Sequence, residues 1–252
     1  MATPLNSSVL KAFDILDLIT PERREISAAT VASELGMNAA TAHRFLLTLE
    51  AAGVLASLRR GSFGFGPRME LLGRTAEAVN PMASRVQAII DGISREVNES
   101  VMACRLGRDG PTCMAVAAAE RPISVNIKVG TVLPMVATAQ GRLWLAMMGD
   151  AERAAWFRAH PGQAPGPAGA ARLEQDLADI RAAGFAVNSG DNEPDIGAVA
   201  VAVLSADGRM QMSLSVFGML SRFDEALIGT SRQLLQEAAE RLQKGGRDRP
   251  RP

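Results

Sequence analysis

The stretch MNAATAHRFLLTLEAAG, residues 37–53, predicts a helix with two very different faces. At about 100° per residue, one side is an apolar stripe suited to packing against a core. This side comprises Ala42, Phe45, Leu46, Leu49 and Gly53. The opposite side comprises Ala40, His43, Arg44, Leu47 and Ala51, flanked by Thr41 and Thr48, and Asn38 is the expected N-cap.

The outward face of this helix begins with small residues where helices usually carry charges. Alanines in the first turn allow the backbone to approach a bulky partner closely while Thr41, His43 and Arg44 reach it. A helix that enters a DNA major groove needs this arrangement. The alternative is a surface helix whose alanines reflect helix propensity alone.

The neighbouring segments favour the DNA interpretation. Residues 26–36 predict a short helix with Ser27 as its cap and Gly36 as its stop, which together with 37–53 makes a helix-turn-helix. Residues 7–20 predict a further helix that closes a small core through Val9 or Leu10, Phe13, Leu16, and Leu18 or Ile19. Residues 53–67 show the residue alternation of β-strands on either side of a glycine-containing turn, which predicts a β-hairpin. Three helices and a hairpin make a winged helix.

Arginines gather around the predicted hairpin. Between residues 44 and 74 there are five arginines and two glutamates, and Arg59 and Arg60 fall at the hairpin tip, where they can pair with phosphates. A solvated turn with arginines by chance is the alternative. The DNA-binding residues that we predict are Ser27, Asn38, Ala40, Thr41, His43, Arg44, Arg59 and Arg60.

Composition limits the remaining possibilities. The 252 residues allow two domains, and the formal net charge of zero provides no overall attraction to nucleic acid or membrane. The two cysteines are too few for a disulfide scaffold, and no Cys/His spacing indicates structural zinc, so we expect no metal and no cofactor. The N-terminus resembles no signal peptide and no apolar run spans a bilayer, so we expect a cytoplasmic protein without membrane contact.

The second half of the chain contains two predicted hairpins. After a break at Asn80-Pro81 and a helix at 84–98, a turn centred on Arg108 and Asp109 would place Cys104 opposite Cys113. Two buried thiols acting as small apolar residues are favoured over a redox switch. In MQMSLSVFG, Met212, Leu214 and Val216 alternate with Ser213, Ser215 and Phe217, and Asp207-Gly208 turns this strand back onto the preceding one.

A helix N-terminus after Pro134 is a candidate ligand site. Thr138 can cap a helix from Ala139, whose first amides, up to Gly141, would present positive partial charge to an organic carboxylate. The alternative is an ordinary capped helix with Leu143, Trp144 and Met147 in the core. His160, in the loose connection HPGQAPGPAGA, is expected to be a solvated loop residue rather than a metal ligand.

The order of these segments resembles the isocitrate lyase regulator (IclR) family of bacterial transcription factors. ISAATVASELGMNAATAHRFLLTLEAAGVL, FGFGPRMELLG, VGTVLPMVATAQGRLWLAMM and GDNEPDIGAVAVAVLSADGRMQMSLSVFGML carry the resemblance. It implies an α/β (α+β) chain with a winged helix-turn-helix domain at 1–66, a linker helix at 67–80, a GAF-like effector-binding and oligomerisation domain with a mostly antiparallel sheet at 81–246, and a flexible tail at 247–252.

The resemblance also implies partners and ligand residues. The partners are a double-stranded DNA operator, a small-molecule effector, and further copies of the chain in a homodimer or a tetramer. The implied effector-binding residues are Ala139, Gln140, Asp191, Asn192, Ala200, Ser215 and Phe217. Val136, the sequence AQGR, and Phe217 depart from common family patterns, which indicates a more apolar pocket and favours an aromatic or other hydrophobic acid.

We therefore expect a ligand-responsive transcriptional regulator without catalytic residues. One alternative is an enzyme with Cys104 or Cys113 as its nucleophile, although neither histidine lies in a recognisable motif with them. Another is an interaction module whose winged helix binds protein instead of DNA.

Overall fold

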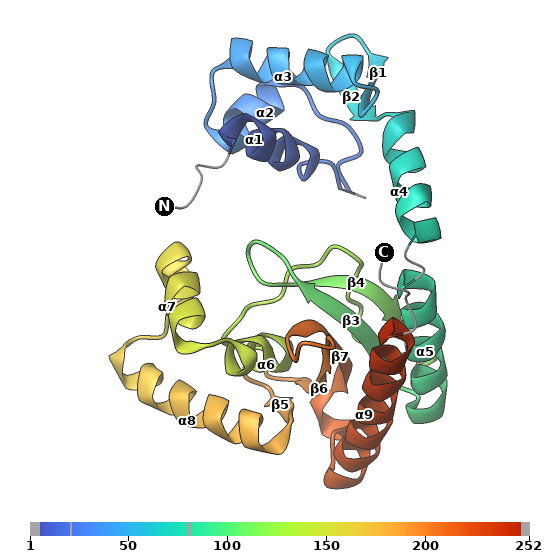
Figure 1. Ribbon diagram of the computed structural model, residues 1–252, viewed down its shortest axis with the longest axis vertical. Coiled ribbons are helices and arrows are strands. Elements are labelled where there is room, and N and C mark those ends of the chain that lie inside the picture. The colour runs from blue at the N-terminus through green and yellow to red at the C-terminus, as the bar shows by residue number, and fades with distance from the viewer. Residues whose placement is uncertain (1–5, 21, 80–81, 248–252) are drawn as a thin grey trace. The chain divides into compact units, whose positions relative to one another are not determined.

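The computed structural model describes residues 6–20, 22–79 and 82–247 and divides the chain into two compact units, residues 1–81 and 82–252 (Figure 1). The expected break at Asn80-Pro81 and the expected tail at 248–252 lie outside the described residues.

The first unit contains the predicted helices and hairpin. Its elements are α1 (Ser7–Leu16), α2 (Ala28–Leu35), α3 (Ala39–Ala51), β1 (Leu55–Arg59), β2 (Ser62–Phe65) and α4 (Pro67–Val79). The predicted caps are confirmed, because the Ser27 hydroxyl accepts from the Thr30 amide and the Asn38 side chain accepts from the Ala40 amide. Gly36 ends α2 with a φ of 60°, a left-handed conformation that glycine adopts without strain.

The core of this unit lies behind α3. Its buried residues are Ile15, Leu16, Ile26, Val31, Ala42, Leu46, Leu55 and Phe63. The prediction that Val9 or Leu10 and Phe13 close this core is wrong, because all three are half-exposed or more. The residues of α1 that are buried in this core are its last two, Ile15 and Leu16.

The second unit is built around one antiparallel sheet, as expected. Its strands are β3 (Ser100–Leu106), β4 (Pro111–Ala117), β5 (Phe185–Ser189), β6 (Ile196–Leu204) and β7 (Met210–Met219), in the order β4-β3-β7-β6-β5. Every pairing is antiparallel. The predicted β6–β7 hairpin is confirmed, with Gly208 at a φ of 81° in its turn.

Helices cover both faces of this sheet. They are α5 (Met82–Val97), α6 (Ala139–Met147), α7 (Asp150–Ala159), α8 (Pro167–Ala183) and α9 (Glu225–Arg247), with short 3-10 turns η1 (Pro161–Gln163) and η2 (Leu220–Arg222). Figure 1 shows α5 and α9 side by side against the sheet and α6 on its other side. The alternation along β7 is confirmed, because Met212, Leu214 and Val216 pack in the cluster with α5 and α9 while Phe217 packs in the cluster with α6.

A buried carboxylate joins the start of β3 to η2. Glu99 is 1% exposed, and its carboxylate accepts hydrogen bonds from Arg222, one of them with a donor–acceptor distance of 2.8 Å. The Arg121 guanidinium lies 3.1 Å from the same carboxylate. A Cβ at Gly218 would stand 2.2 Å from Glu99 Oε2, so only glycine lets the carboxylate sit there.

No helix among residues 6–20, 22–79 and 82–247 is both long and apolar enough to cross a membrane.

Candidate functional site

The outward face of α3 carries polar side chains that the protein itself does not engage. His43 and Arg44 are exposed, and neither side chain has a hydrogen bond or an ion pair with any described residue. Ala40 is exposed beside them, and Thr41 is half-buried. Because Leu46 is fully buried on the rear of the helix, the core fixes which face points outward.

Of the two arginines predicted at the hairpin tip, one has no side-chain partner among the described residues and the other forms an ion pair. Arg60 lies in the turn beside Gly61, is exposed, and has no partner among the described residues. Arg59 instead pairs with the Glu25 carboxylate, which also accepts from the Ser62 hydroxyl at 2.7 Å. The Ser62 hydrogen bond, and to a lesser degree Arg59, lowers the pKa of Glu25.

The predicted DNA-binding residues therefore fall into two groups. The exposed ones are Asn38, Ala40, His43, Arg44, Arg59 and Arg60. Ser27 and Thr41 are half-buried, and the Ser27 hydroxyl lies 3.0 Å from the Thr30 hydroxyl as part of the cap of α2. The face that the structure makes available is thus the first half of α3 together with the hairpin tip.

In the second unit, the N-terminus of α6 is buried against the sheet. The Thr138 hydroxyl accepts from the Gly141 amide at 3.0 Å and donates to the Pro134 carbonyl at 2.7 Å, which confirms the predicted cap. The amides of Ala139 and Gln140 donate to no described group. Such amides form the positive end of the helix dipole and suit an anion.

A close backbone contact holds this helix end in place. A Cβ at Gly141 would lie 2.2 Å from the Met135 carbonyl oxygen and 2.4 Å from its Cα. The loop before α6 can therefore approach the helix only because residue 141 is glycine. Met147, predicted as core, is 38% exposed, whereas Leu143 and Trp144 are buried as predicted.

Two predicted effector residues meet directly. Gln140 Nε2 donates to Ser215 Oγ at 2.8 Å, and both side chains are nine-tenths buried or more. Gln140 Oε1 is buried without a partner among the described residues. The same is true of Ser213 Oγ, which lies on β7 as Ser215 does. A buried polar atom without a partner costs about 1–3 kcal/mol, so these atoms favour a ligand that hydrogen-bonds to them.

The other predicted effector residues divide by position. Ala200 lies opposite Ser215 in the sheet, and Phe217 packs in the same buried cluster as Ala139. Asp191 and Asn192 lie on an exposed loop, and the Asp191 carboxylate accepts from Arg142 at 2.8 Å. The structure therefore brings Ala139, Gln140, Ala200, Ser215 and Phe217 together, and it leaves Asp191 and Asn192 at the periphery.

Sequence reasoning missed two groups that support this site. Arg142 is 9% exposed and joins α6 to the Val187 carbonyl as well as to Asp191. Gln163 accepts from the Met135 amide at 3.1 Å and donates to the Asp109 carbonyl at 3.0 Å. The sequence offers no signal for either, because every one of these contacts joins segments that are at least 28 residues apart.

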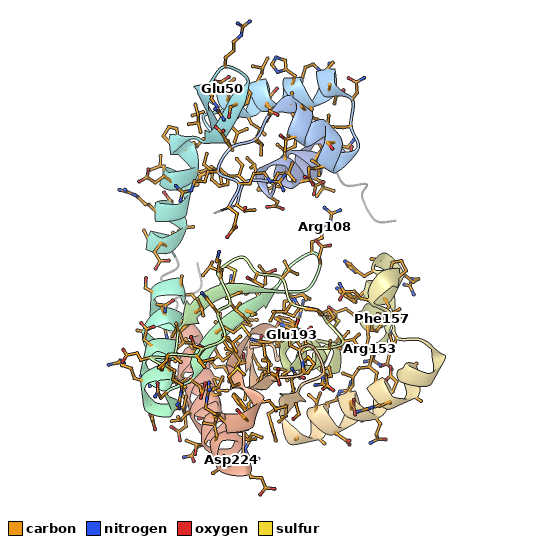
Figure 2. The ribbon with its side chains drawn as sticks, turned by 180° about the vertical axis from the view of Figure 1, so that it is seen from behind. Glu50, Arg108, Arg153, Phe157, Glu193 and Asp224 are labelled. Atoms are coloured by element: carbon orange, nitrogen blue, oxygen red, sulfur yellow. The ribbon has the colours of Figure 1, made fainter. Side chains whose placement is uncertain are left out.

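The prediction that His160 is a solvated loop residue is wrong. Its ring stacks on Trp156 with centroids 4.2 Å apart, and its Nδ1 lies 2.9 Å from the Trp156 carbonyl oxygen. Its Nε2 lies 3.6 Å from Asp109 Oδ1. His160 is the C-cap of α7, the helix from which Arg153 and Phe157 project in Figure 2.

The chemistry available at this site is binding. It combines unpaired helix amides, an amide side chain and hydroxyls with an apolar wall, which suits a small acid with an apolar body. Among the residues that the structure describes, no group of three or more His, Cys, Asp and Glu side chains could hold a metal ion.

Comparisons with known proteins identify the family of both units. Residues 8–59 match the model of the IclR helix-turn-helix domain, and residues 77–244 match that of the bacterial transcriptional regulator IclR C-terminal domain. The second match alone spans more than half of the chain.

Individual relatives extend over nearly the whole chain. The HTH-type transcriptional regulator XynR of Escherichia coli is 27% identical over 246 residues, covering 96% of this chain and 97% of XynR. A crystal structure of a putative IclR transcriptional regulator from a Silicibacter species has a TM-score of 0.83 at 23% identity, covering 97% and 98% of the two chains. An IclR homologue from Microbacterium hydrocarbonoxydans, crystallised with 4-hydroxybenzoate, has a TM-score of 0.77 at 19% identity, covering 96% and 100%.

Proposed function

The chain belongs to the IclR family of bacterial transcriptional regulators, and we propose that it binds its operator through α3 and the hairpin tip. We further propose that its affinity for the operator changes when a hydrophobic organic acid binds beside Gln140. The family is one of DNA-binding regulators with an effector-binding C-terminal domain. The alternative of an enzyme with a cysteine nucleophile is therefore wrong.

The observation that carries the DNA half of the proposal is the free outward face of α3. His43 and Arg44 project from a helix whose rear is locked in the core, and Arg60 extends from the hairpin without a partner among the described residues. A groove-reading helix and a phosphate-contacting wing need these properties. Ser27, Asn38, Ala40, Thr41 and Arg59 complete the proposed interface.

Exposed apolar side chains on the first unit support assembly. Phe13 on α1 is 61% exposed, and Leu71 on α4 is 63% exposed, with Val9, Leu10 and Leu72 near half. Exposed apolar side chains of this size are candidate contacts for a partner chain. A second copy of the chain is the partner we propose, in a homodimer or a tetramer, which would mirror a near-palindromic operator.

The proposed effector is a carboxylic acid with an aromatic or aliphatic body. The amides of Ala139 and Gln140 would receive the carboxylate, and Phe217 and Ala200 would contact the body. The Microbacterium homologue that binds 4-hydroxybenzoate supports an aromatic acid. We propose that the acid favours one spacing of the two winged helices in the assembly, with α4 as the transmitting element, and that this occurs in the cytoplasm.

Replacing Arg44 with alanine is expected to weaken operator binding by about 10- to 100-fold, because a base contact made by an exposed arginine contributes about 1–3 kcal/mol. The operator would be selected from a random duplex library, and affinity measured by fluorescence anisotropy. Arg172→Ala, which removes an exposed arginine from the second unit, is the matched control and should bind as the wild type does. Equal affinities for Arg44→Ala and Arg172→Ala would contradict the proposed interface.

Replacing Arg60 with alanine tests the wing. If Arg60 contacts a phosphate, the variant should bind all duplexes more weakly by a similar factor, and the slope of log affinity against log salt should fall by about one. An unchanged slope would place Arg60 outside the DNA contact.

Gln140→Ala tests the effector site. Aromatic and aliphatic carboxylic acids, starting with 4-hydroxybenzoate, would be screened for those that raise the melting temperature of the wild type, as a ligand of the folded state must. The stabilising acid should also change operator affinity. We expect Gln140→Ala to lose most of the acid's thermal shift, because it removes the amide that bridges to Ser215.

Gln175→Ala, an exposed glutamine on α8, is the control for the effector site and should keep the full shift. A screen without any stabilising acid, or equal shifts in the two variants, would overturn the effector half of the proposal. The DNA half would stand independently on the anisotropy measurements.

A further inference from the structure

The two cysteines of the chain face each other across β3 and β4. Cys104 is the register partner of Cys113. The Cys113 amide donates to the Thr131 carbonyl at 2.9 Å, and its carbonyl accepts from the Gly130 amide at 2.8 Å. Both backbone groups of Cys113 therefore point away from β3, which makes this a non-hydrogen-bonded pair of the antiparallel ladder.

That type of pair suits a covalent bond. Directly opposed residues without mutual backbone hydrogen bonds have their Cα atoms about 4.5 Å apart and their side chains closest together. Disulfides need a Cα separation of about 4.4–6.8 Å. The register therefore places the two sulfurs opposite each other, beside the point where the ladder shifts register between Ala103 and Cys104.

The two thiols already interact and are chemically unequal. The side-chain interaction with Cys113, together with burial, raises the pKa of Cys104, and the Cys113 thiol lies 3.5 Å from the Ala115 carbonyl, to which it donates. The interaction with Cys104 lowers the pKa of Cys113 and so favours its thiolate. A thiolate next to a neighbouring thiol is the arrangement in which one sulfur attacks and the other resolves.

The pair also lies next to polar residues of the proposed effector site. Cys104 lies opposite Ser213 on β7, whose hydroxyl is buried without a partner among the described residues. Both cysteines belong to the buried cluster that contains Ala139 and Phe217. The backbone partners of Cys113, Gly130 and Thr131, lie just before the loop that leads into α6.

We infer that Cys104 and Cys113 form a redox-modifiable site, in which hydrogen peroxide converts the two thiols into an intrachain disulfide that alters the effector site. The Cys113 thiolate attacks one peroxide oxygen, the O–O bond breaks, and hydroxide leaves, giving a sulfenic acid on Cys113. The Cys104 sulfur then attacks the Cys113 sulfur, the S–O bond breaks, and water leaves with the Cys104 proton. The two thiols lose two electrons, which reduce the peroxide to water.

Access to the pair comes through the sheet edge. The far side of β4 at Cys113 is covered by a short stretch, Gly130–Leu133, and not by a further strand. Edge segments of this kind open locally at lower free energy than the core. A molecule as small as hydrogen peroxide can then reach a sulfur that is fully buried in the closed state.

The first test is the intact mass of the reduced, full-length wild type after exposure to a modest excess of hydrogen peroxide and alkylation. We expect a loss of about 2 Da, no alkylated cysteine, and full reversal by dithiothreitol. Because the chain has only these two cysteines, the assignment is unambiguous. Two alkylated thiols, a linked pair of chains, or separate oxidation of each sulfur would overturn the inference.

Single variants separate the two chemical roles. Cys104→Ser should stop at a sulfenic acid on Cys113, seen as a gain of about 16 Da that dimedone traps. Cys113→Ser should react at least about tenfold more slowly, because the remaining thiol, Cys104, is the one whose pKa burial raises, which disfavours its thiolate. Equal rates for the two variants would contradict the assigned roles, and the wild-type mass does not depend on either variant folding.

The coupling to the effector site rests on the proposed function and is read separately. Amide exchange over residues 133–141 would be compared in the reduced and oxidised wild type without any ligand. We expect slower exchange in the oxidised form, because the bond ties β4 and its covering segment to β3. If the disulfide forms and amide exchange over residues 133–141 is unchanged, only the coupling to the effector site is overturned. If the proposed effector is wrong, the acid screen shows it and these two measurements do not.

Discussion

Leu46→Ala is expected to destabilise the winged-helix unit by about 3 kcal/mol and to abolish specific operator binding at ordinary temperatures. Leu46 is fully buried on the rear of α3. Its truncation removes apolar contacts and leaves a cavity that the surrounding helices fill only in part. A unit of this size has little stability in reserve, so the loss is felt across the whole unit.

The measurement is amide hydrogen exchange over residues 28–51, together with operator affinity. Leu47→Ala is the matched control, because it removes the same atoms from the next position of the same helix, where the side chain is 45% exposed. The control should change the protection of α2 and α3 by less than about 1 kcal/mol. If the two variants showed equal protection, the outward direction of Arg44 would no longer follow from packing.

Glu99→Gln is expected to lower the stability of the second unit by about 3 kcal/mol, near the lower end of the range for breaking a buried ion pair. Glutamine keeps the shape of the side chain and removes the charge that faces Arg222 and Arg121. The lower end of the range applies because the side chains of Arg222 and Arg121 are 26% and 33% exposed and keep some hydration. The Glu99 carboxylate also raises the pKa of Arg222, so their attraction favours the charged pair.

Calorimetry checks this expectation, with a fall in melting temperature of about 6–12 °C for the second unit. Glu240→Gln is the control, because Glu240 forms an ion pair with Lys244 at a distance of 3.6 Å. Both side chains are more than 60% exposed. An exposed pair of this kind contributes little. A melting temperature for Glu99→Gln equal to that of Glu240→Gln would show that the buried carboxylate is not a structural clamp.

Local patterns predicted the elements correctly wherever neighbours in the sequence decide the outcome. The caps at Ser27, Asn38 and Thr138 depend on a side chain and an amide two or three residues later. The opposition of Cys104 and Cys113 follows from counting outward from a turn. In each of these contacts both residues lie within one short segment, so the segment alone is enough to predict the contact.

The same reasoning failed where a residue's environment comes from elsewhere in the chain. Phe13 has the periodicity of a core residue, yet it is 61% exposed because the unit packs against the side of α1 that carries Ile15 and Leu16. His160 lies in a segment rich in glycine and proline, yet it stacks on Trp156 and faces Asp109. Spacing alone does not reveal which other segment will cover a given face.

The sequence by itself therefore determined the helix-turn-helix and hairpin, the outward face of α3, the alternation along β7, and, through its family, the kind of protein. Only the tertiary structure decided that Gln140 meets Ser215, that Asp191 is held by Arg142, that Arg59 is held by Glu25, and that Glu99 meets Arg222 across 123 positions of chain. The physical reason is that periodicity and capping act within a few residues, whereas a binding site is assembled from side chains that are brought together only when the sheet forms.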